Sequence, residues 1–339
     1  MTTVVDRLAL VEKYLSEAVE GHGRASARLA LDQIDLGVHC EDVIVNLLAA
    51  SQHEVGERWL ANEWTVADEH LASGATQHAL DALASTIDVP EPIGSVLVVC
   101  AEGDWHSLPA QMLAEMLRSR GYDVACLGAS TPVDHVLDLV GRRRPDAVAV
   151  SCNLPIFFRG VARLADAAHT RGIPVLAGGR AMGTDERRAK RLGADGWAPN
   201  LDSAVRLLRR WQQEPPELLA GPTTLDEGAV QLELSADDVA ADALAQWSLA
   251  FPLGSSYDDA QLSKTREDLA FITRFVAAAL LVRDPSVLTE FLDWLGALQS
   301  NRGVPPRALE VELDVLVPLL TGHDRRAGRL LAWARSSSA

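Results

Sequence analysis

Several residue types and patterns are scarce in this 339-residue chain, and each scarcity excludes a class of protein. Only four cysteines occur, at scattered positions, and three of them fall in or beside expected buried strands. This distribution indicates reduced thiols rather than a disulfide framework or a zinc site. No apolar run reaches the length of a membrane span, and the first residues lack the layout of a signal peptide. We therefore expect a soluble cytoplasmic protein.

Basic residues are also too few for a protein that binds nucleic acid. The chain has 31 Lys and Arg against 47 Asp and Glu, which gives a net charge of −16. Binding to nucleic acid requires a basic face, and no helix-turn-helix with exposed basic residues is found. We expect neither a nucleic-acid partner nor a membrane partner.

The hydrophobic pattern changes at two places and predicts a multi-domain protein of α and α/β type. Residues 1–88 carry four amphipathic stripes with short connectors, which is typical of an antiparallel four-helix bundle. Residues 93–213 alternate strand and helix and predict a Rossmann-like domain with a doubly wound parallel sheet. An acidic, proline-rich linker is expected at 214–234, followed by an all-helical domain at 235–339.

The expected Rossmann-like domain carries the first candidate site. Its first strand is not followed by Gly-x-Gly-x-x-Gly, which disfavours nicotinamide and flavin dinucleotides. Ligands of such sheets bind beyond the carboxyl ends of the strands, so the residues that follow each strand are candidates. The expected strands are Val96–Cys100, Asp123–Leu127, Ala147–Ser151, Ile173–Ala177 and a short one near Gly196-Trp197.

A candidate metal ligand, His106, lies directly after the first strand, in the stretch from Ala101 to Ala110. Asp104 lies two positions before it and can accept a hydrogen bond from its ring N–H. Such a bond fixes the tautomer and makes the other ring nitrogen a better metal ligand. Taken alone, however, this spacing favours an ordinary histidine on a surface loop.

Three short motifs, each just past an expected strand, together resemble the signature of cobalamin-binding domains. They are Asp104-x-His106-x-x-Pro109, Ser151-Cys152-Asn153 and Gly178-Gly179. The resemblance implies that His106 binds cobalt from below, as the lower axial ligand. It also implies that Ser151 and the glycine pair line the slot for the displaced nucleotide tail. Asp104, Trp105 and Asn153 complete the expected contacts with the cofactor.

Two positions depart from that family pattern. Pro109 replaces a glycine, and Asn153 replaces a leucine. Proline supplies no backbone N–H and fixes φ, so the path of the loop is expected to differ. Asn153 is expected to put a polar group in the tail slot. Neither change removes the cobalt ligand itself.

The amino-terminal bundle carries a second pattern, Trp59 followed after nine residues by Glu69-His70. It resembles the bundles of light-responsive, adenosylcobalamin-binding regulators, where these residues surround the upper face of the cofactor. In light-dependent repressors a histidine next to the tryptophan caps cobalt after the adenosyl group leaves. Here that position is Leu60, which cannot coordinate a metal. We therefore expect no bis-histidine state after photolysis unless another residue is recruited.

The carboxyl-terminal region resembles the helical domain of photocobilins, photoreceptors that bind adenosylcobalamin and biliverdin. The resemblance rests on the overall pattern of residues 269–320. A bilin needs an apolar slot with cationic groups for its propionates, and all four cysteines precede residue 153, so binding would be non-covalent. The plain alternative is a core stripe with a solvated arginine face. The candidate bilin contacts are Trp247, Phe251, Tyr257, Arg266 and Arg274.

The sequence thus predicts a light sensor of the photocobilin kind rather than an enzyme, because light would act on the cofactor without substrate turnover. Adenosylcobalamin would lie between the bundle and the Rossmann-like domain, and biliverdin in or beside the last helices. Output is expected through light-dependent homo-oligomeric assembly or a separate output protein. Two alternatives stay open: a corrinoid carrier protein for methyl transfer, and a light-independent cobalamin sensor whose third domain is an interaction module.

Overall fold

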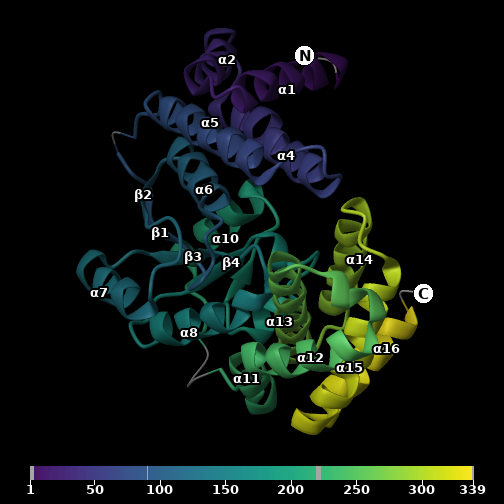
Figure 1. The fold of residues 1–339 in the computed structure, drawn as a ribbon. Coiled ribbons are helices and arrows are strands. Elements are labelled where there is room, and N and C mark those ends of the chain that lie inside the picture. The colour runs from purple at the N-terminus through teal and green to yellow at the C-terminus, as the bar shows by residue number, and fades with distance from the viewer. Residues whose placement is uncertain (1–3, 90, 219–222, 338–339) are drawn as a thin grey trace.

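The computed structural model describes residues 4–89, 91–218 and 223–337 (Figure 1). Residue 90, between the first two predicted domains, and residues 219–222, within the predicted linker, lie outside the described residues. Three parts follow one another along the chain. A helical bundle covers one end of a parallel sheet domain, and the last helices pack beside that sheet (Figure 1). The predicted fold class is confirmed.

The bundle is built around a long continuous helix and its partner α5. The long helix consists of three consecutive segments, the middle one a stretch of π-helix, and such bulges often occur at functional sites. Helix α5 begins at a capping box in which Thr65 and Asp68 bond each other's backbone N–H groups. The bounds are α1 (Val4–Val19), α2 (Gly23–Asp35), α3 (Cys40–Val43), η1 (Ile44–Ala49), α4 (Ala50–Leu60) and α5 (Val66–Ala84).

The sheet has five parallel strands in the order β2-β1-β3-β4-β5. Strand order reverses between β1 and β3, because the chain runs from β1 outward to β2 and returns to the other side. Open α/β sheets bind ligands beyond the carboxyl ends of the strands at this point. The bounds are β1 (Gly94–Cys100), β2 (Tyr122–Cys126), β3 (Ala147–Ser151), β4 (Val175–Gly178) and β5 (Gly196–Trp197).

Helices cover both faces of the sheet, as the continuous apolar strands predict. One face packs on α6 (Ser107–Ser119) and α10 (Leu201–Gln213) through a buried cluster that includes Leu117, Leu208 and Trp211. The other face packs on the remaining helices of the domain. These are α7 (Val133–Arg143), α8 (Phe158–His169) and α9 (Arg187–Arg191), with the short turns η2 (Pro155–Phe157) and η3 (Arg180–Met182).

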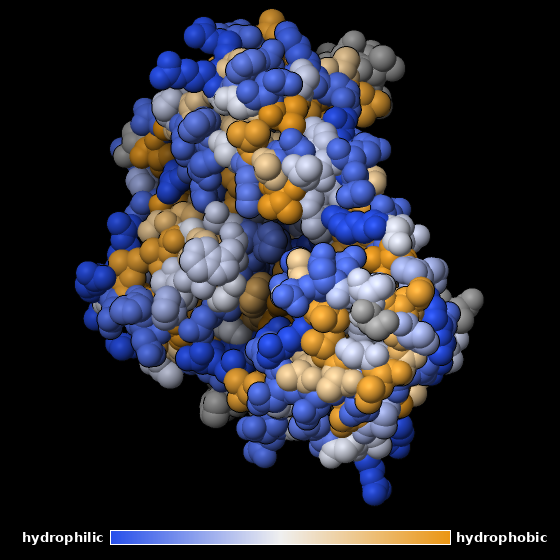
Figure 2. All heavy atoms as spheres, viewed as in Figure 1, coloured by the Kyte–Doolittle hydropathy of each residue, from blue (hydrophilic) through white to orange (hydrophobic). Residues whose placement is uncertain are grey.

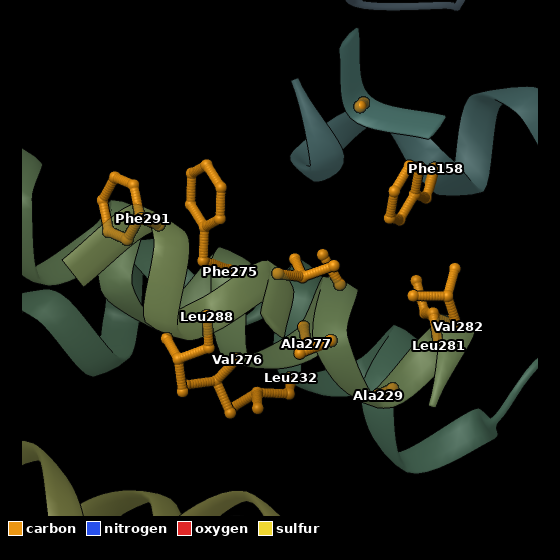
Figure 3. Close-up of a cluster of buried hydrophobic side chains, with 14 of the residues drawn as sticks. Phe158, Ala229, Leu232, Phe275, Val276, Ala277, Leu281, Val282, Leu288 and Phe291 are labelled. Atoms are coloured by element: carbon orange, nitrogen blue, oxygen red, sulfur yellow. The ribbon is translucent and has the colours of Figure 1, made fainter. Parts of the chain in front are cut away.

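The third domain shares its apolar core with that second face of the sheet domain. Phe158 at the start of α8 points toward Leu281 and Val282 of α13 (Figure 3). The domain is therefore packed against the sheet domain rather than only tethered to it. Its elements are α11 (Glu227–Leu234), α12 (Ala236–Ala250), η4 (Pro252–Ser256), α13 (Asp259–Val282), α14 (Ser286–Asn301), α15 (Pro306–His323) and α16 (Arg325–Ser337).

Helix α11 lies inside the stretch that the sequence predicts as a linker, so the expectation of an extended linker up to residue 234 is wrong there. The Asp226 side chain caps the helix by accepting a hydrogen bond from the Ala229 N–H, and Ala229 and Leu232 are buried in the shared core. Eight residues give too short a pattern to reveal such a helix, which is stabilised by packing. None of the helices in the described ranges is long and apolar enough to cross a lipid bilayer.

Candidate cofactor site

Asp104 is the buried centre of the loop that follows β1. Its side chain is fully buried, and one carboxylate oxygen accepts from His106 Nδ1 at 2.7 Å and from the His106 backbone N–H at 3.0 Å. The other oxygen accepts from the backbone N–H of Asn153 at 2.8 Å. Burial alone would raise the pKa of Asp104, but these hydrogen bonds bring it below its ordinary value. The group is therefore a carboxylate at neutral pH.

His106 is held by Asp104 but reaches solvent, with 55% of its side chain exposed. The bond to Asp104 raises the pKa of His106, burial opposes this rise, and the charges of Asp104 and Glu69 add to it. With the Nδ1 proton directed at Asp104, Nε2 is the nitrogen that carries a lone pair in the neutral ring. The arrangement is that of a metal-ligating histidine with a buried carboxylate behind it.

The two departures from the family pattern have clear places in the structure. Pro109 lies in the first turn of α6, where a backbone N–H has no partner within the helix and its loss costs little. The Asn153 amide nitrogen lies 3.4 Å from Asp104 Oδ2, from the His106 carbonyl oxygen and from Ser151 Oγ. Asn153 thus bonds the loop that carries His106, in addition to bordering a pocket.

Ser151 and the glycine pair lie together at the carboxyl edge of the sheet. Ser151 ends β3, is 4% exposed and stands in register with Gly178 of β4. Gly179 has φ of +96°, and a Cβ added there would come within 2.3 Å of the Cys152 carbonyl oxygen. Glycine is therefore required at 179 for the two loops to approach. A pocket of about 530 Å³ begins here, bordered by Asn153, Gly179 and Trp197.

The bundle contributes three candidate cofactor contacts, and one of them, Glu69, lies near His106. Glu69 on α5 accepts a hydrogen bond from Ser73 Oγ at 2.7 Å, and its carboxylate is close enough to raise the pKa of His106. His70 Nε2 lies 3.5 Å from the Glu69 carboxylate, and 74% of its side chain is exposed. Trp59 lies in the last turn of α4, which borders a hollow between the bundle and the other two domains (Figure 2).

Two further positions belong to this description: Trp105 next to the expected lower ligand His106, and Leu60 next to Trp59. Trp105, directly before His106, is 76% exposed, and its contact with the cofactor stays a prediction. Leu60 ends α4, and its carbonyl oxygen accepts a hydrogen bond from Asn301 of α14 at 2.9 Å.

The side chains around His106 suit a cofactor whose metal is coordinated mostly by the cofactor itself. In the ranges that the structure describes, no three His, Cys, Asp or Glu side chains form a group that could hold a metal ion. A cobalamin needs only one axial cobalt ligand from the protein, because its corrin ring supplies four nitrogen ligands. The exposed Nε2 of His106, the carboxylate behind it and the glycine-lined pocket meet that demand.

Three of the five candidate bilin contacts form one aromatic cluster. Trp247 and Phe251 are buried with ring centroids 4.9 Å apart, Tyr257 lies 5.5 Å from Trp247, and Trp247 Nε1 donates to the Ala308 carbonyl at 3.2 Å. On α13, Arg274 pairs with Asp237 at 2.7 Å, and Arg266 is exposed. Their role stays a prediction.

Sequence reasoning missed the contacts that the third domain makes with both cofactor-side domains. Arg188 on α9 is buried and bonds Asp284 and Ser286, and Trp294 stacks on Trp59. The sequence contains no signal for these pairs, because an arginine and a tryptophan in helical stripes look like surface and core residues.

Comparison with known proteins agrees with this geometry. Residues 94–206 match a family described as B12 binding domain, and residues 10–84 match a second family of the same description. The chain is 30% identical to the HTH-type transcriptional repressor CarA of Myxococcus xanthus over 185 residues, which are 53% of this chain and 59% of that protein. It is 22% identical to dimethylamine corrinoid protein 1 of Methanosarcina mazei over 200 residues, 56% of this chain and 91% of that protein.

Among solved structures, the monomethylamine corrinoid protein of Methanosarcina barkeri has a similar fold. The TM-score is 0.51 at 20% identity, and the superposition covers 60% of this chain and 98% of that one. The two family matches end at residues 206 and 84, so neither reaches the third domain. The chain therefore carries a helical and a Rossmann-like B12 binding domain in succession, and these indicate a cobalamin or corrinoid cofactor.

Proposed function

We propose that this protein is a light sensor that binds adenosylcobalamin between the bundle and the carboxyl edge of the sheet. His106 is the lower cobalt ligand, and Trp59, Glu69 and His70 face the upper ligand. When bound, this cofactor supplies a cobalt–carbon bond that visible light breaks. The signal is a rearrangement of the domains or of the quaternary structure, because loss of the upper ligand removes contacts made in only one state.

The observation that supports this proposal most is the meeting of two candidate sets from separate domains. The Asp104–His106 pair follows β1 at the point where strand order reverses, and Glu69 of the bundle lies close enough to raise the pKa of His106. Asp104 orients the imidazole and keeps the proton on Nδ1. With the cofactor bound on His106, the bundle would cover its upper face.

The test is an absorption titration of the purified protein in the dark with adenosylcobalamin, followed by green light. We expect a protein-bound spectrum with histidine as the lower ligand, and loss of the alkylcobalamin bands on illumination. His106→Ala should remove the histidine-ligated spectrum. His135→Ala, an exposed histidine on α7 of the same domain, should not change it. Binding without a histidine-ligated spectrum would refute the assignment of His106.

For the second pigment we propose biliverdin, held non-covalently in or beside the carboxyl-terminal helices. The support is the resemblance of residues 269–320 to the helical domain of photocobilins, together with the aromatic cluster around Trp247. Adding biliverdin in the same titration should give a bound red-absorbing band. If adenosylcobalamin binds and biliverdin stays free, the third domain is an interaction module and the protein senses cobalamin alone.

A corrinoid carrier protein for methyl transfer is the second candidate. It is favoured by the alignment with dimethylamine corrinoid protein 1, which covers 91% of that protein. A carrier must hand a small methyl group to an enzyme across an open upper face, whereas Trp59 and the Glu69-His70 pair suit a bulky upper ligand. Tighter binding of methylcobalamin than of adenosylcobalamin, with no response to light, would favour the carrier.

A further inference from the structure

One face of α14 runs along the edge of the candidate cobalamin site. Ser286, Glu290 and Trp294 are spaced four apart, and Asn301 follows seven residues later, so all four side chains lie on one side of the helix. Sixteen residues at 1.5 Å per residue give α14 a length of about 24 Å. The helix is therefore long enough for its two ends to contact both domains that would hold the cofactor.

The first end of α14 is attached to the sheet domain. Arg188 of α9, with 6% of its side chain exposed, donates to Asp284 at 2.8 Å and to Ser286 Oγ at 2.9 Å. Ser286 and Glu290 then border the pocket that Asn153 and Gly179 border on its other side. This end is fixed beside the edge at which the nucleotide tail is expected.

The second half of α14 and the residue after it contact the last turn of α4, and we call these contacts the Trp59 contacts. Trp294 stacks on Trp59 with ring centroids 6.2 Å apart and planes 16° from parallel. The Arg302 guanidinium lies 4.5 Å from the centroid of the same indole and donates to the Trp59 carbonyl oxygen at 3.3 Å. Asn301 donates to the Leu60 carbonyl oxygen at 2.9 Å. Figure 1 shows this end of α14 rising to the end of α4.

A row of aromatic rings connects the Trp59 contacts to the core of the third domain. The Trp294 ring lies 6.0 Å from that of Phe291, which stacks at 3.8 Å on Phe275 of α13 (Figure 3). Phe275 and Phe291 are buried among the core residues. A displacement of Trp59 therefore reaches the packed interior of the third domain through contacts that are already in place.

We propose that α14 is a third wall of the cobalamin site, and that Trp294 and Arg302 compete with a bulky upper ligand for Trp59. The third domain thereby senses whether that ligand is present. This inference rests on the proposed function, since it takes the upper face of the cofactor to lie against Trp59. With a small upper ligand, Trp294 and Arg302 keep their contacts with Trp59. An adenosyl group that packs on the Trp59 indole breaks these contacts.

Hydrogen exchange in the full chain tests the competition without any substitution. In the dark, adenosylcobalamin should speed exchange in residues 290–302 relative to the cofactor-free protein, and hydroxocobalamin should not. Illumination of the adenosylcobalamin complex should restore slow exchange. Equal exchange with the two cobalamins would overturn the proposal, as would slower exchange with adenosylcobalamin alone.

Trp294→Ala supplies the second readout. Trp294 is 38% exposed, so the truncation removes the stack on Trp59 and little of the core. Without cofactor, exchange at the end of α4 should rise in this variant. Its affinity for adenosylcobalamin should increase about two- to tenfold, the strength of one aromatic pair, while that for hydroxocobalamin stays unchanged. An unchanged or reduced preference for adenosylcobalamin would show that Trp294 does not compete.

Matched controls come from the same domain. Leu249→Ala removes an 88% exposed apolar side chain of α12 and should change neither exchange at α4 nor the preference. Arg302→Gln should act like Trp294→Ala, whereas Arg307→Gln, at an exposed arginine that pairs with Glu310, should not. If the wild-type protein binds no cobalamin, both the proposed function and this inference fail. If it binds adenosylcobalamin and α14 does not respond, only this inference fails.

Discussion

Replacing Asp104 with asparagine tests whether the buried carboxylate behind His106 prepares it for cobalt. The substitution keeps the size of the side chain but removes its charge. One amide oxygen can still accept from His106 Nδ1, but the amide NH₂ then faces the backbone N–H of Asn153, which Asp104 Oδ2 accepts at 2.8 Å. Two donors face each other, so a buried N–H loses its partner at a cost of about 1–3 kcal/mol.

The expected effect on cofactor binding follows from the role of the carboxylate. Loss of such a partner behind a metal-ligating histidine typically lowers metal affinity about 10- to 100-fold. At pH 8 we therefore expect Asp104→Asn to bind hydroxocobalamin about 10- to 100-fold more weakly in its histidine-ligated form, measured by absorption titration. Asp123→Asn, at an exposed position of β2, is the matched control and should bind like the wild type.

The pH dependence of cobalt ligation by His106 should also differ between the wild type and Asp104→Asn. The bond to Asp104 raises the pKa of His106, and a protonated imidazole cannot bind cobalt. Wild-type ligation should therefore weaken as the pH falls through this raised pKa. Without the carboxylate charge the pKa of His106 falls, so ligation in Asp104→Asn should persist to lower pH although it is weaker at high pH. Equal affinities and equal pH profiles in the two proteins would refute the reasoning.

The same linkage acts on the stability of the cofactor-free protein. A histidine whose pKa is raised on folding contributes stability that is fully present below its unfolded value of about 6.5 and is lost as the pH rises through the folded value. The wild type should therefore lose this contribution between those two values. Asp104→Asn should show no such loss, which urea denaturation at a series of pH values measures.

Three further predictions concern the frame of the site. Gly179→Ala should destabilise the fold by at least about 1–3 kcal/mol in urea denaturation, because φ there is +96° and a Cβ meets the Cys152 carbonyl at 2.3 Å. Gly178→Ala, whose nearest contact would be 3.4 Å, should be tolerated, and equal losses would contradict this reading. Arg188→Ala should cost about 1–3 kcal/mol, because Asp284 loses its ionic partner and keeps only its hydrogen bonds from Ser286, and it should speed proteolysis between the sheet domain and the third domain. Burial raises the pKa of Glu312 well above its ordinary value of 4.5, so the folded chain holds a proton and loses stability as the pH rises above that value. Glu312→Gln should therefore raise the thermal midpoint more at pH 8 than at pH 5, and a gain independent of pH would show that the charge is not the cause.

The sheet domain could be predicted from the sequence because its signals are local. Each strand is a short apolar run that ends at a polar or glycine-containing loop, and this is enough to place His106, Ser151 and Gly179 at one edge of a parallel sheet. The Asp104–His106 bond could also be predicted, since two residues of one loop need no distant partner to meet.

Contacts between separate loops and between domains could not be predicted in the same way. The place of Asn153 in the tail slot stays a prediction, but its bonds to Asp104 from a different loop, through its backbone and amide nitrogens, were not foreseen. The partner of Asn153 depends on how closely β1 and β3 pack, which a linear pattern does not contain. For the same reason, the helical spacing of the aromatic residues of the third domain does not reveal the stack of Trp294 on Trp59.

The attachment of α14 at both ends also bears on the choice between a sensor and a carrier. A methyl carrier must open its upper face in each cycle, and here opening would have to break the contacts of α14 with Trp59 or those with Arg188. A sensor needs the opposite property, in which the closed contacts persist until the state of one ligand changes. Trp294, which stacks on Trp59, is 38% exposed and the stack is of modest strength, whereas Arg188, which pairs with Asp284, has only 6% of its side chain exposed. The weaker contact is thus the one next to the proposed position of the upper ligand, which is where a switch driven by that ligand would have to act.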